Sequence, residues 1–115
     1  MKRIASAVVA PTGPNYTQAV ETAGFALLLA SLGSCTAITL RMYADRKGWN
    51  IGALKVSLTL SLDAEGRTLI ERTLDSNARL DGEQRLKLLD IASKTPVTKT
   101  LLAGASITTR RAEVA

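Results

Sequence analysis

The sequence predicts an α+β fold in which a mainly antiparallel sheet wraps around one long central helix. Residues 27–49, LLLASLGSCTAITLRMYADRKGW, contain the most apolar run of the chain and predict the helix. Residues 54–62 alternate between apolar and polar side chains, which is typical of a half-buried strand. Strand-like segments occur in pairs joined by turn residues, and such pairs favour local antiparallel hairpins.

The first half of the chain predicts a hairpin followed by the helix. Residues 4–10 and 16–22 are rich in β-branched and small residues, and the turn-forming stretch PTGPN separates them at positions 11–15. The helix is expected over residues 25–47, and Gly48 ends it. Its apolar positions run almost all round, so we expect it to be buried on every side.

The second half predicts another hairpin and another helix. Residues 54–62 and 68–75 form the two strands, with AEGR at positions 64–67 as the turn between them. Asp81 is expected to cap the following helix, and Gln84 at the third helical position completes a capping box.

The C-terminal part predicts a broken helix and a last strand. Pro96 interrupts the helix, residues 97–102 form a further helical turn, and residues 105–111 form a strand after Gly104. The predicted order is strand, strand, helix, strand, strand, helix, short helix and strand, within a single domain spanning residues 1–115. A chain of this size builds only a modest core, so a homo-oligomer is expected.

The composition argues against several classes of function. The net charge of +5 comes from separate small basic clusters, and no basic stripe interleaved with aromatic residues indicates nucleic-acid binding. The chain has no histidine and one cysteine, which removes Cys-His pairs, His-based metal sites and a disulfide framework. No CxxC motif or glycine-rich phosphate loop is present, so neither a metal nor a cofactor is predicted.

Two segments resemble membrane-targeting sequences, but we interpret neither as one. The apolar stretch at residues 4–10, after MKR, is at the lower limit of length for a signal peptide. Residues 22–40 carry no charge and approach the length of a spanning helix, but Thr, Ser, Gly and Cys occur throughout and weaken insertion. We therefore expect a core helix, no membrane partner and a reducing, cytoplasmic location.

The lone cysteine, Cys35, has two interpretations. It is either the nucleophile of an enzyme or a small apolar side chain in a packed helix. The residues three and four positions away are Ser31, Leu32, Ile38 and Thr39. This mixed surface suits a narrow substrate slot or close helix packing, and packing is the more common role for such a cysteine.

Two motifs resemble those of the OsmC/Ohr family, the osmotically inducible and organic-hydroperoxide-resistance proteins. The first is ASLGSCT around Cys35, followed by LRMYA and KGW. The second combines ER at positions 71–72, LDGEQR at 80–85, LLDIA at 88–92 and the segment from PV to TL at 96–101. The resemblance covers residues 25–107 and includes the first hairpin only weakly.

This resemblance implies an intertwined homodimer and thiol-dependent reduction of organic hydroperoxides in oxidative stress defence, with Cys35 as the peroxidatic cysteine. In that chemistry the thiolate attacks the peroxide, an alcohol leaves and a sulfenic acid forms. A second cysteine then closes a disulfide, which an external dithiol reopens. The family supplies positive charge beside the thiol from an Arg on an N-terminal loop, oriented by a Glu near the helix start.

The sequence departs from that family pattern at several positions. Thr95 stands where the resolving cysteine is expected, and Thr98 stands where a histidine is common. Ala26 stands where the helix-start Glu would fall, and the loop that would carry the Arg is shortened to residues 21–24. Because the hydroxyl of Thr95 cannot form a disulfide, the intramolecular resolving step is lost.

Two nearby charged residues are poor replacements for the missing parts. Arg41 lies six positions after Cys35, about 240° around the helix, so it does not share the face of the thiol. Glu21 lies outside the predicted helix, and a carboxylate disfavours a neighbouring thiolate.

We therefore expect an OsmC-like protein whose peroxide-reducing activity is weak or lost and whose turnover depends on an external thiol. The alternative is a non-catalytic dimer of the same fold that binds an apolar small molecule, because the short loop leaves the dimer groove open. A third interpretation is a fold that is stable only with its partner chain, since a deleted strand exposes a sheet edge.

Overall fold

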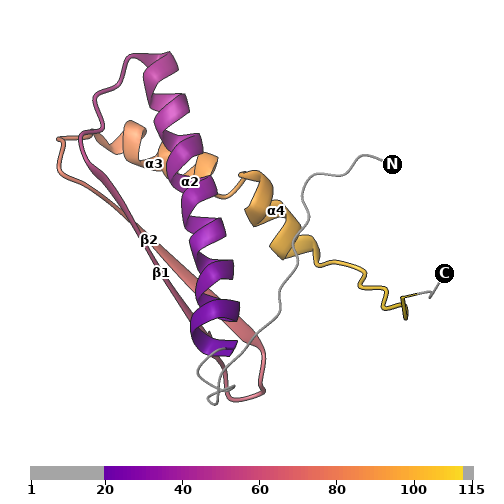
Figure 1. Cartoon of the computed structure of the whole chain (residues 1–115). Coiled ribbons are helices and arrows are strands. Elements are labelled where there is room, and N and C mark those ends of the chain that lie inside the picture. Colours follow the sequence, from indigo (N-terminus) through magenta and orange to yellow (C-terminus); the bar gives the residue numbers. More distant parts are fainter. Residues whose placement is uncertain (1–19, 113–115) are drawn as a thin grey trace.

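The computed structural model describes residues 20–112, apart from the side chains of Glu21 and Thr22. In chain order its elements are the π-helix η1 (Val20–Phe25), the helix α2 (Ala26–Lys47), the strands β1 (Leu54–Leu62) and β2 (Thr68–Ser76), and the helices α3 (Gly82–Ala92) and α4 (Pro96–Ala103). The two strands form one antiparallel sheet beside α2, and α3 and α4 also contact α2 (Figure 1). The predicted α+β architecture is confirmed.

The long helix α2 agrees closely with the prediction. Gly48 follows its last residue with a φ of 70°, a left-handed conformation that other residues rarely adopt. Gly33 continues the helix without a break, and a Cβ at this position would lie 2.8 Å from Leu58 Cδ1 of β1. Glycine at position 33 therefore allows the sheet to approach the helix closely.

Burial on α2 is confined to one stripe. The stripe consists of residues four positions apart, Leu32, Thr36, Leu40 and Ala44. Apolar residues on other faces remain exposed, with exposed fractions of 64% for Leu27, 60% for Ile38 and 50% for Met42. The expectation that α2 is buried on every side is wrong for the single chain, because the described elements that pack against it do not surround it.

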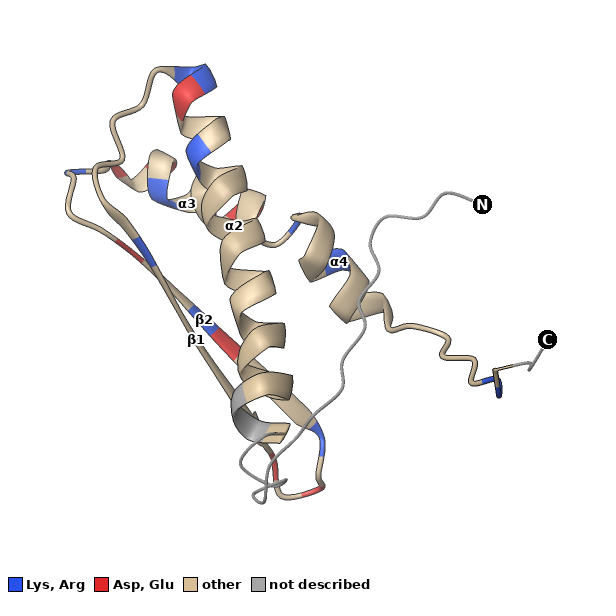
Figure 2. Ribbon diagram, in the orientation of Figure 1, with Lys and Arg blue, Asp and Glu red and all other residues tan. Residues whose placement is uncertain are grey.

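The segment Ala23–Lys47 is long and apolar enough to cross a membrane, a test that core helices and signal sequences also pass. No charged residue occurs between Ala26 and Leu40, whereas β2 and α3 carry charges of both signs (Figure 2). The expectation that this helix belongs to a protein core stays a prediction.

The strands β1 and β2 form the predicted second hairpin. Leu58 pairs with Arg72, and Leu54 pairs with Ser76, one residue beyond the predicted strand end. Alternate residues of β1 and β2 are half-buried, as expected for a sheet with one covered face.

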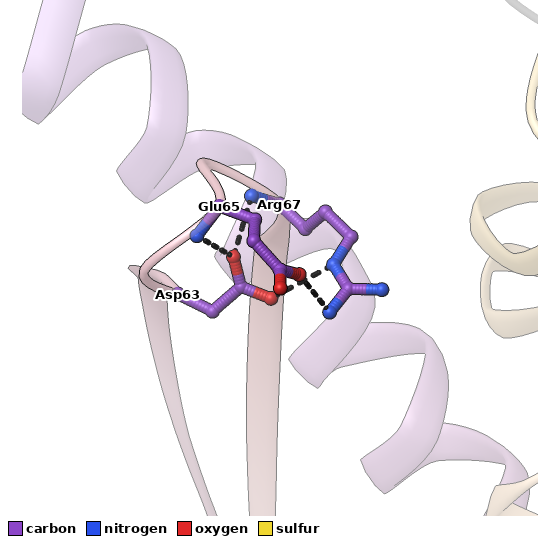
Figure 3. Close-up of polar contacts among 3 residues, drawn as sticks. All are labelled: Asp63, Glu65 and Arg67. Carbon is purple, nitrogen blue, oxygen red and sulfur yellow. Dashed lines mark hydrogen bonds and ion pairs between the residues drawn. The ribbon is translucent and has the colours of Figure 1, made fainter.

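The turn between the two strands is organised by Asp63. Its Oδ1 accepts hydrogen bonds from the amides of Glu65 and Arg67, both at 2.9 Å. Its Oδ2 accepts from Arg67 Nε at 2.9 Å, and Arg67 also pairs with Glu65 (Figure 3). The hydrogen bond from the Arg67 amide is the largest of the effects that lower the pKa of Asp63 below its ordinary value.

The predicted capping box at the start of α3 is confirmed. Asp81 Oδ1 accepts from the Gln84 amide at 2.7 Å, and Gln84 Oε1 accepts from the Asp81 amide at 3.1 Å. Pro96 occupies the first turn of α4, where its missing N–H costs no hydrogen bond. The further helical turn predicted after Pro96 is therefore a separate short helix.

The predicted strands at the two ends of the chain are not seen in the described residues. Residues 104–112 contain no strand, so the prediction for residues 105–111 is wrong for the single chain. A strand needs a hydrogen-bonding partner, and in the described sheet β1 and β2 pair only with each other. The first predicted hairpin lies outside the described residues, except that residues 20–22 are helical rather than extended.

The core of the described region is small. Its buried apolar side chains cluster on and beside the C-terminal half of α2: Leu40, Ala44, Ile51, Leu88 and Ala92. Tyr43 and Trp49 pack beside this cluster edge to face, with ring centroids 5.5 Å apart. Several large apolar side chains stay exposed, which is consistent with a further surface being buried on association.

Candidate functional site

Cys35 lies in the middle of α2 as a free, half-buried thiol. It follows Leu32 by three residues and precedes Thr36, which lies about 100° around the helix. Leu32 and Thr36 are buried, whereas Ile38 is exposed. The thiol therefore lies at the border between the packed stripe and the exposed apolar side of α2.

An arginine from the sheet bonds to the residue that follows Cys35 in sequence. Arg72 Nη1 donates to Thr36 Oγ1 at 3.0 Å and to Thr98 Oγ1 at 2.8 Å. Thr98 Oγ1 lies 2.6 Å from Thr95 Oγ1. We call these four residues the arginine–threonine network. It joins α2, β2 and the start of α4.

The three threonines of this network are almost completely buried, with exposed fractions of 0% for Thr36, 1% for Thr95 and 8% for Thr98. Thr36 also donates to the carbonyl of Leu32 at 2.7 Å. Hydroxyls buried this deeply are costly without partners, and each of these has one. The network is therefore a satisfied polar layer within the packing.

Two of the substituted family positions belong to this network. Thr95 holds the position predicted for the resolving cysteine, and Thr98 the position where histidine is common. Their hydroxyl oxygens lie 2.6 Å apart, and each lies 3.3 Å from the carbonyl oxygen of Ala92. One hydroxyl therefore donates to the other, which in turn donates to the carbonyl. They supply hydrogen bonds where the family pattern expects a thiol and an imidazole.

Sequence reasoning missed Arg72 as a site residue. The signal for it is the alternation of β2, because Ile70, Arg72 and Leu74 share the half-buried face of the strand. A cation on the face of a sheet that packs against an apolar helix requires polar partners. The buried threonines of α2 and α4 provide them.

The other candidates named from the sequence are not brought to the thiol. Arg41 Nη2 donates to the carbonyl of Gly52 at 2.7 Å and so ties α2 to the loop before β1. Ala26 is exposed at the start of α2, and the side chain of Glu21 lies outside the described part of the chain. In the described residues, no group of three or more His, Cys, Asp or Glu side chains could hold a metal ion.

A groove of about 530 Å³ opens beside the network. Its aliphatic walls come from α2, β2 and α4 and consist of Leu28, Leu32, Ile70, Leu101 and Leu102. Arg72 and Thr98 contribute polar groups to the same groove. We call it the α2–α4 groove. Its α2 wall lies one to two turns before Cys35.

The comparisons with known proteins agree with this architecture. A search of curated proteins found no match. A crystal structure from Psychrobacter arcticus 273-4, described as an osmotic-stress-induced and detoxification-response protein, matches with a TM-score of 0.57 and 24% identity. The match covers 64% of this chain and 56% of that one, so the chain spans little more than half the length of that protein. The sequence model for OsmC-like protein matches residues 18–110. The chain therefore belongs to the OsmC-like protein family.

Proposed function

We propose that this OsmC-like protein reduces organic hydroperoxides at Cys35, slowly, with electrons from an external thiol. Family membership and the stress-response description of the similar structure support a general OsmC-like function. The single observation that favours chemistry at Cys35 is the guanidinium of Arg72, hydrogen-bonded to the adjacent Thr36. A fixed cation near a reacting group stabilises the negative charge that develops on the leaving peroxide oxygen.

The proposed reaction has two stages. The Cys35 thiolate attacks the peroxide oxygen farther from carbon, the O–O bond breaks, and the alkoxide leaves as an alcohol after taking a proton. Cys35 is oxidised to a sulfenic acid. An external thiol attacks that sulfur and releases water, and a second external thiol then reduces the mixed disulfide and restores Cys35.

Turnover is expected to be slow for two structural reasons. The position of the resolving cysteine is occupied by Thr95, which is buried and hydrogen-bonded, so every cycle waits for a thiol from solution. In addition, Arg72 donates its hydrogen bond to Thr36 rather than to the thiol, so its charge stabilises the reacting atoms only indirectly. The cytoplasm is the proposed location, since free thiols are abundant there.

We also propose that the protein is a homodimer that covers the exposed apolar side of α2. Leu27, Ile38 and Met42 on α2 are at least half exposed, and an exposed apolar surface of this kind is typical of an association site. Cys35 then lies at the edge of the interface. Light scattering should give a dimer mass, and Ile38→Glu should shift the mass toward that of one chain. A wild-type monomer would contradict the proposal.

The reaction is tested by intact mass spectrometry after incubation with cumene hydroperoxide and dimedone, which traps sulfenic acids. We expect one dimedone adduct per chain, located at Cys35, and no adduct on Cys35→Ser. Adding a small thiol before dimedone should prevent the adduct. An unmodified wild-type protein with its thiol still free would reject the reaction.

The α2–α4 groove favours a second candidate function, non-catalytic binding of an apolar small molecule. Its walls are mainly aliphatic, and its volume of about 530 Å³ is in the range of small-molecule sites. Native mass spectrometry of freshly purified protein tests this function, with a retained ligand expected. Purified protein that neither retains a ligand nor binds an added alkanol would reject it.

A further inference from the structure

The side chain of Arg72 has an unused donor edge. Nη1 carries two hydrogens, and the two threonine hydroxyls of Thr36 and Thr98 accept from it. Within the described part of the chain, Arg72 makes no other side-chain hydrogen bond and no ion pair. Its Nε–H and the neighbouring Nη2–H therefore remain for a ligand. These two parallel donors match the two oxygens of a carboxylate.

The guanidinium is held in place before any ligand arrives. Arg72 lies on the half-buried face of β2, opposite Leu58 of β1. The threonines that anchor Nη1 come from α2 and α4 and are almost fully buried. Because the packing fixes these hydroxyls, a ligand does not need to order the arginine on binding.

The surroundings of Arg72 favour an anion. None of the described residues that line the α2–α4 groove is acidic, and the chain carries a net charge of +5. Among the described residues Arg72 has no anionic partner, and a half-buried guanidinium without one has lost water without full compensation. A carboxylate would supply the missing partner through two charge-assisted hydrogen bonds.

The remainder of the groove favours a hydrocarbon chain. The exposed fraction of its aliphatic side chains ranges from 5% for Leu32 to 80% for Leu102. An apolar chain lying along them would remove this surface from water, which is favourable in proportion to the area covered. One cation therefore lies in an otherwise mainly apolar groove.

We infer that the α2–α4 groove binds an amphipathic monocarboxylate, with the carboxylate on Nε and Nη2 of Arg72 and the apolar chain along the leucines. A phosphate is a poorer match, because Arg72 is the one cation among the described residues that line the groove. The inference rests on the binding function given above as the second candidate and requires no reaction at Cys35. Cys35→Ser should therefore bind the same ligand with unchanged affinity.

Isothermal titration calorimetry with decanoate and decan-1-ol, below micelle-forming concentrations, tests this inference. The two probes share the apolar chain and differ in the head group. We expect wild-type protein to bind decanoate about tenfold more tightly, since hydrogen bonds to charged groups contribute more than neutral ones. Arg72→Gln should lose this preference and still bind decanol. Arg79→Gln is the matched control, because Arg79 is exposed and does not line the groove.

Leu102→Asp provides a second variant that should fold normally, because Leu102 is 80% exposed. Its carboxylate at the groove should weaken decanoate binding more than decanol binding. Equal affinities of wild-type protein for the two probes, or an unchanged preference in Arg72→Gln or Leu102→Asp, would overturn the inference and leave apolar binding in place. Binding of neither probe would overturn both.

Discussion

The C-terminal half of α2 packs into a closed aliphatic core, whereas its N-terminal half faces a polar network and an open groove. Leu40 and Ala44 are fully buried and pack in one cluster with Ile51. Two turns earlier along the buried stripe, Leu32 lines the α2–α4 groove, and Thr36 between the two regions bonds Arg72. One helix therefore serves two purposes: one half stabilises the fold and the other presents chemical groups.

The two halves of α2 differ in the kinds of chemical group that lie along them. The aliphatic side chains of the core cluster carry no group that can react or form a hydrogen bond. Along the N-terminal half of α2, by contrast, lie the Cys35 thiol, the guanidinium that β2 supplies to Thr36, and one wall of the α2–α4 groove. Variants should therefore separate into those that change stability and those that change reactivity.

The largest effect is expected for Leu40→Ala in the closed half. Leu40 is fully buried in the core cluster, and removing its side chain should lower the free energy of unfolding by about 2–5 kcal/mol. Urea denaturation measures this change. Ser34→Ala, on an exposed position of the same helix, should change stability by less than about 0.5 kcal/mol. A similar loss of stability in both variants would show that the buried cluster around Leu40 does not stabilise the fold more than an exposed position of α2 does.

The next largest effect is expected for Arg72→Met in the open half. The variant removes the cation bonded to Thr36, so the rate of Cys35 oxidation by cumene hydroperoxide should fall about tenfold. The three threonine hydroxyls retain other hydrogen bonds, and stability should therefore fall by only about 1–2 kcal/mol. Stopped-flow measurement of thiol loss gives the rate. Arg79→Met is the control and should react like wild type. An unchanged rate in Arg72→Met would show that Arg72 takes no part in the oxidation of Cys35.

A smaller effect is expected for Asp81→Ala at the start of α3. This change removes the side-chain half of the capping box, which should cost about 1 kcal/mol of unfolding free energy. Cys35 reactivity should not change, since α3 supplies none of the site residues. Asp81→Asn, which keeps an acceptor, is the control and should recover most of the loss. A tenfold change in reactivity would show coupling between the two regions.

The smallest effect is expected at Asp63 in the β1–β2 turn. Because folding lowers the pKa of this carboxyl, its contribution to stability is present above its unfolded-state pKa and is lost as pH falls through its folded-state pKa. NMR titration of the side-chain carboxyl should give a midpoint below that of an unfolded peptide. Asp63→Asn should remove this part of the acid dependence. A midpoint at or above the peptide value would contradict the turn geometry.

Local patterns predicted the described elements well. The alternation of residues 54–62, the capping pair Asp81 and Gln84, and Gly48 after α2 each act over a few residues, so the sequence contains their full cause. The strand expected at residues 105–111 failed for the opposite reason. Its hydrogen-bonding partner is not part of the described sheet, and a strand pattern alone cannot supply one.

The site could be predicted only in part. The resemblance identified Cys35 and the two substituted positions, Thr95 and Thr98, because motifs are read along the chain. It did not identify the network. Arg72 lies 36 residues from Thr36 and 26 residues from Thr98 in sequence, and the three side chains meet only through tertiary packing. The pattern of β2 places Arg72 on the inner face, but its partners depend on the fold.

The most direct test compares the rates at which Cys35 is oxidised by cumene hydroperoxide and by hydrogen peroxide at one pH. If the thiol works beside an apolar groove, the aromatic peroxide should react about tenfold faster or more, because burying its hydrocarbon part contributes binding energy. Equal rates, a faster reaction with hydrogen peroxide, or no oxidation by either would contradict the account.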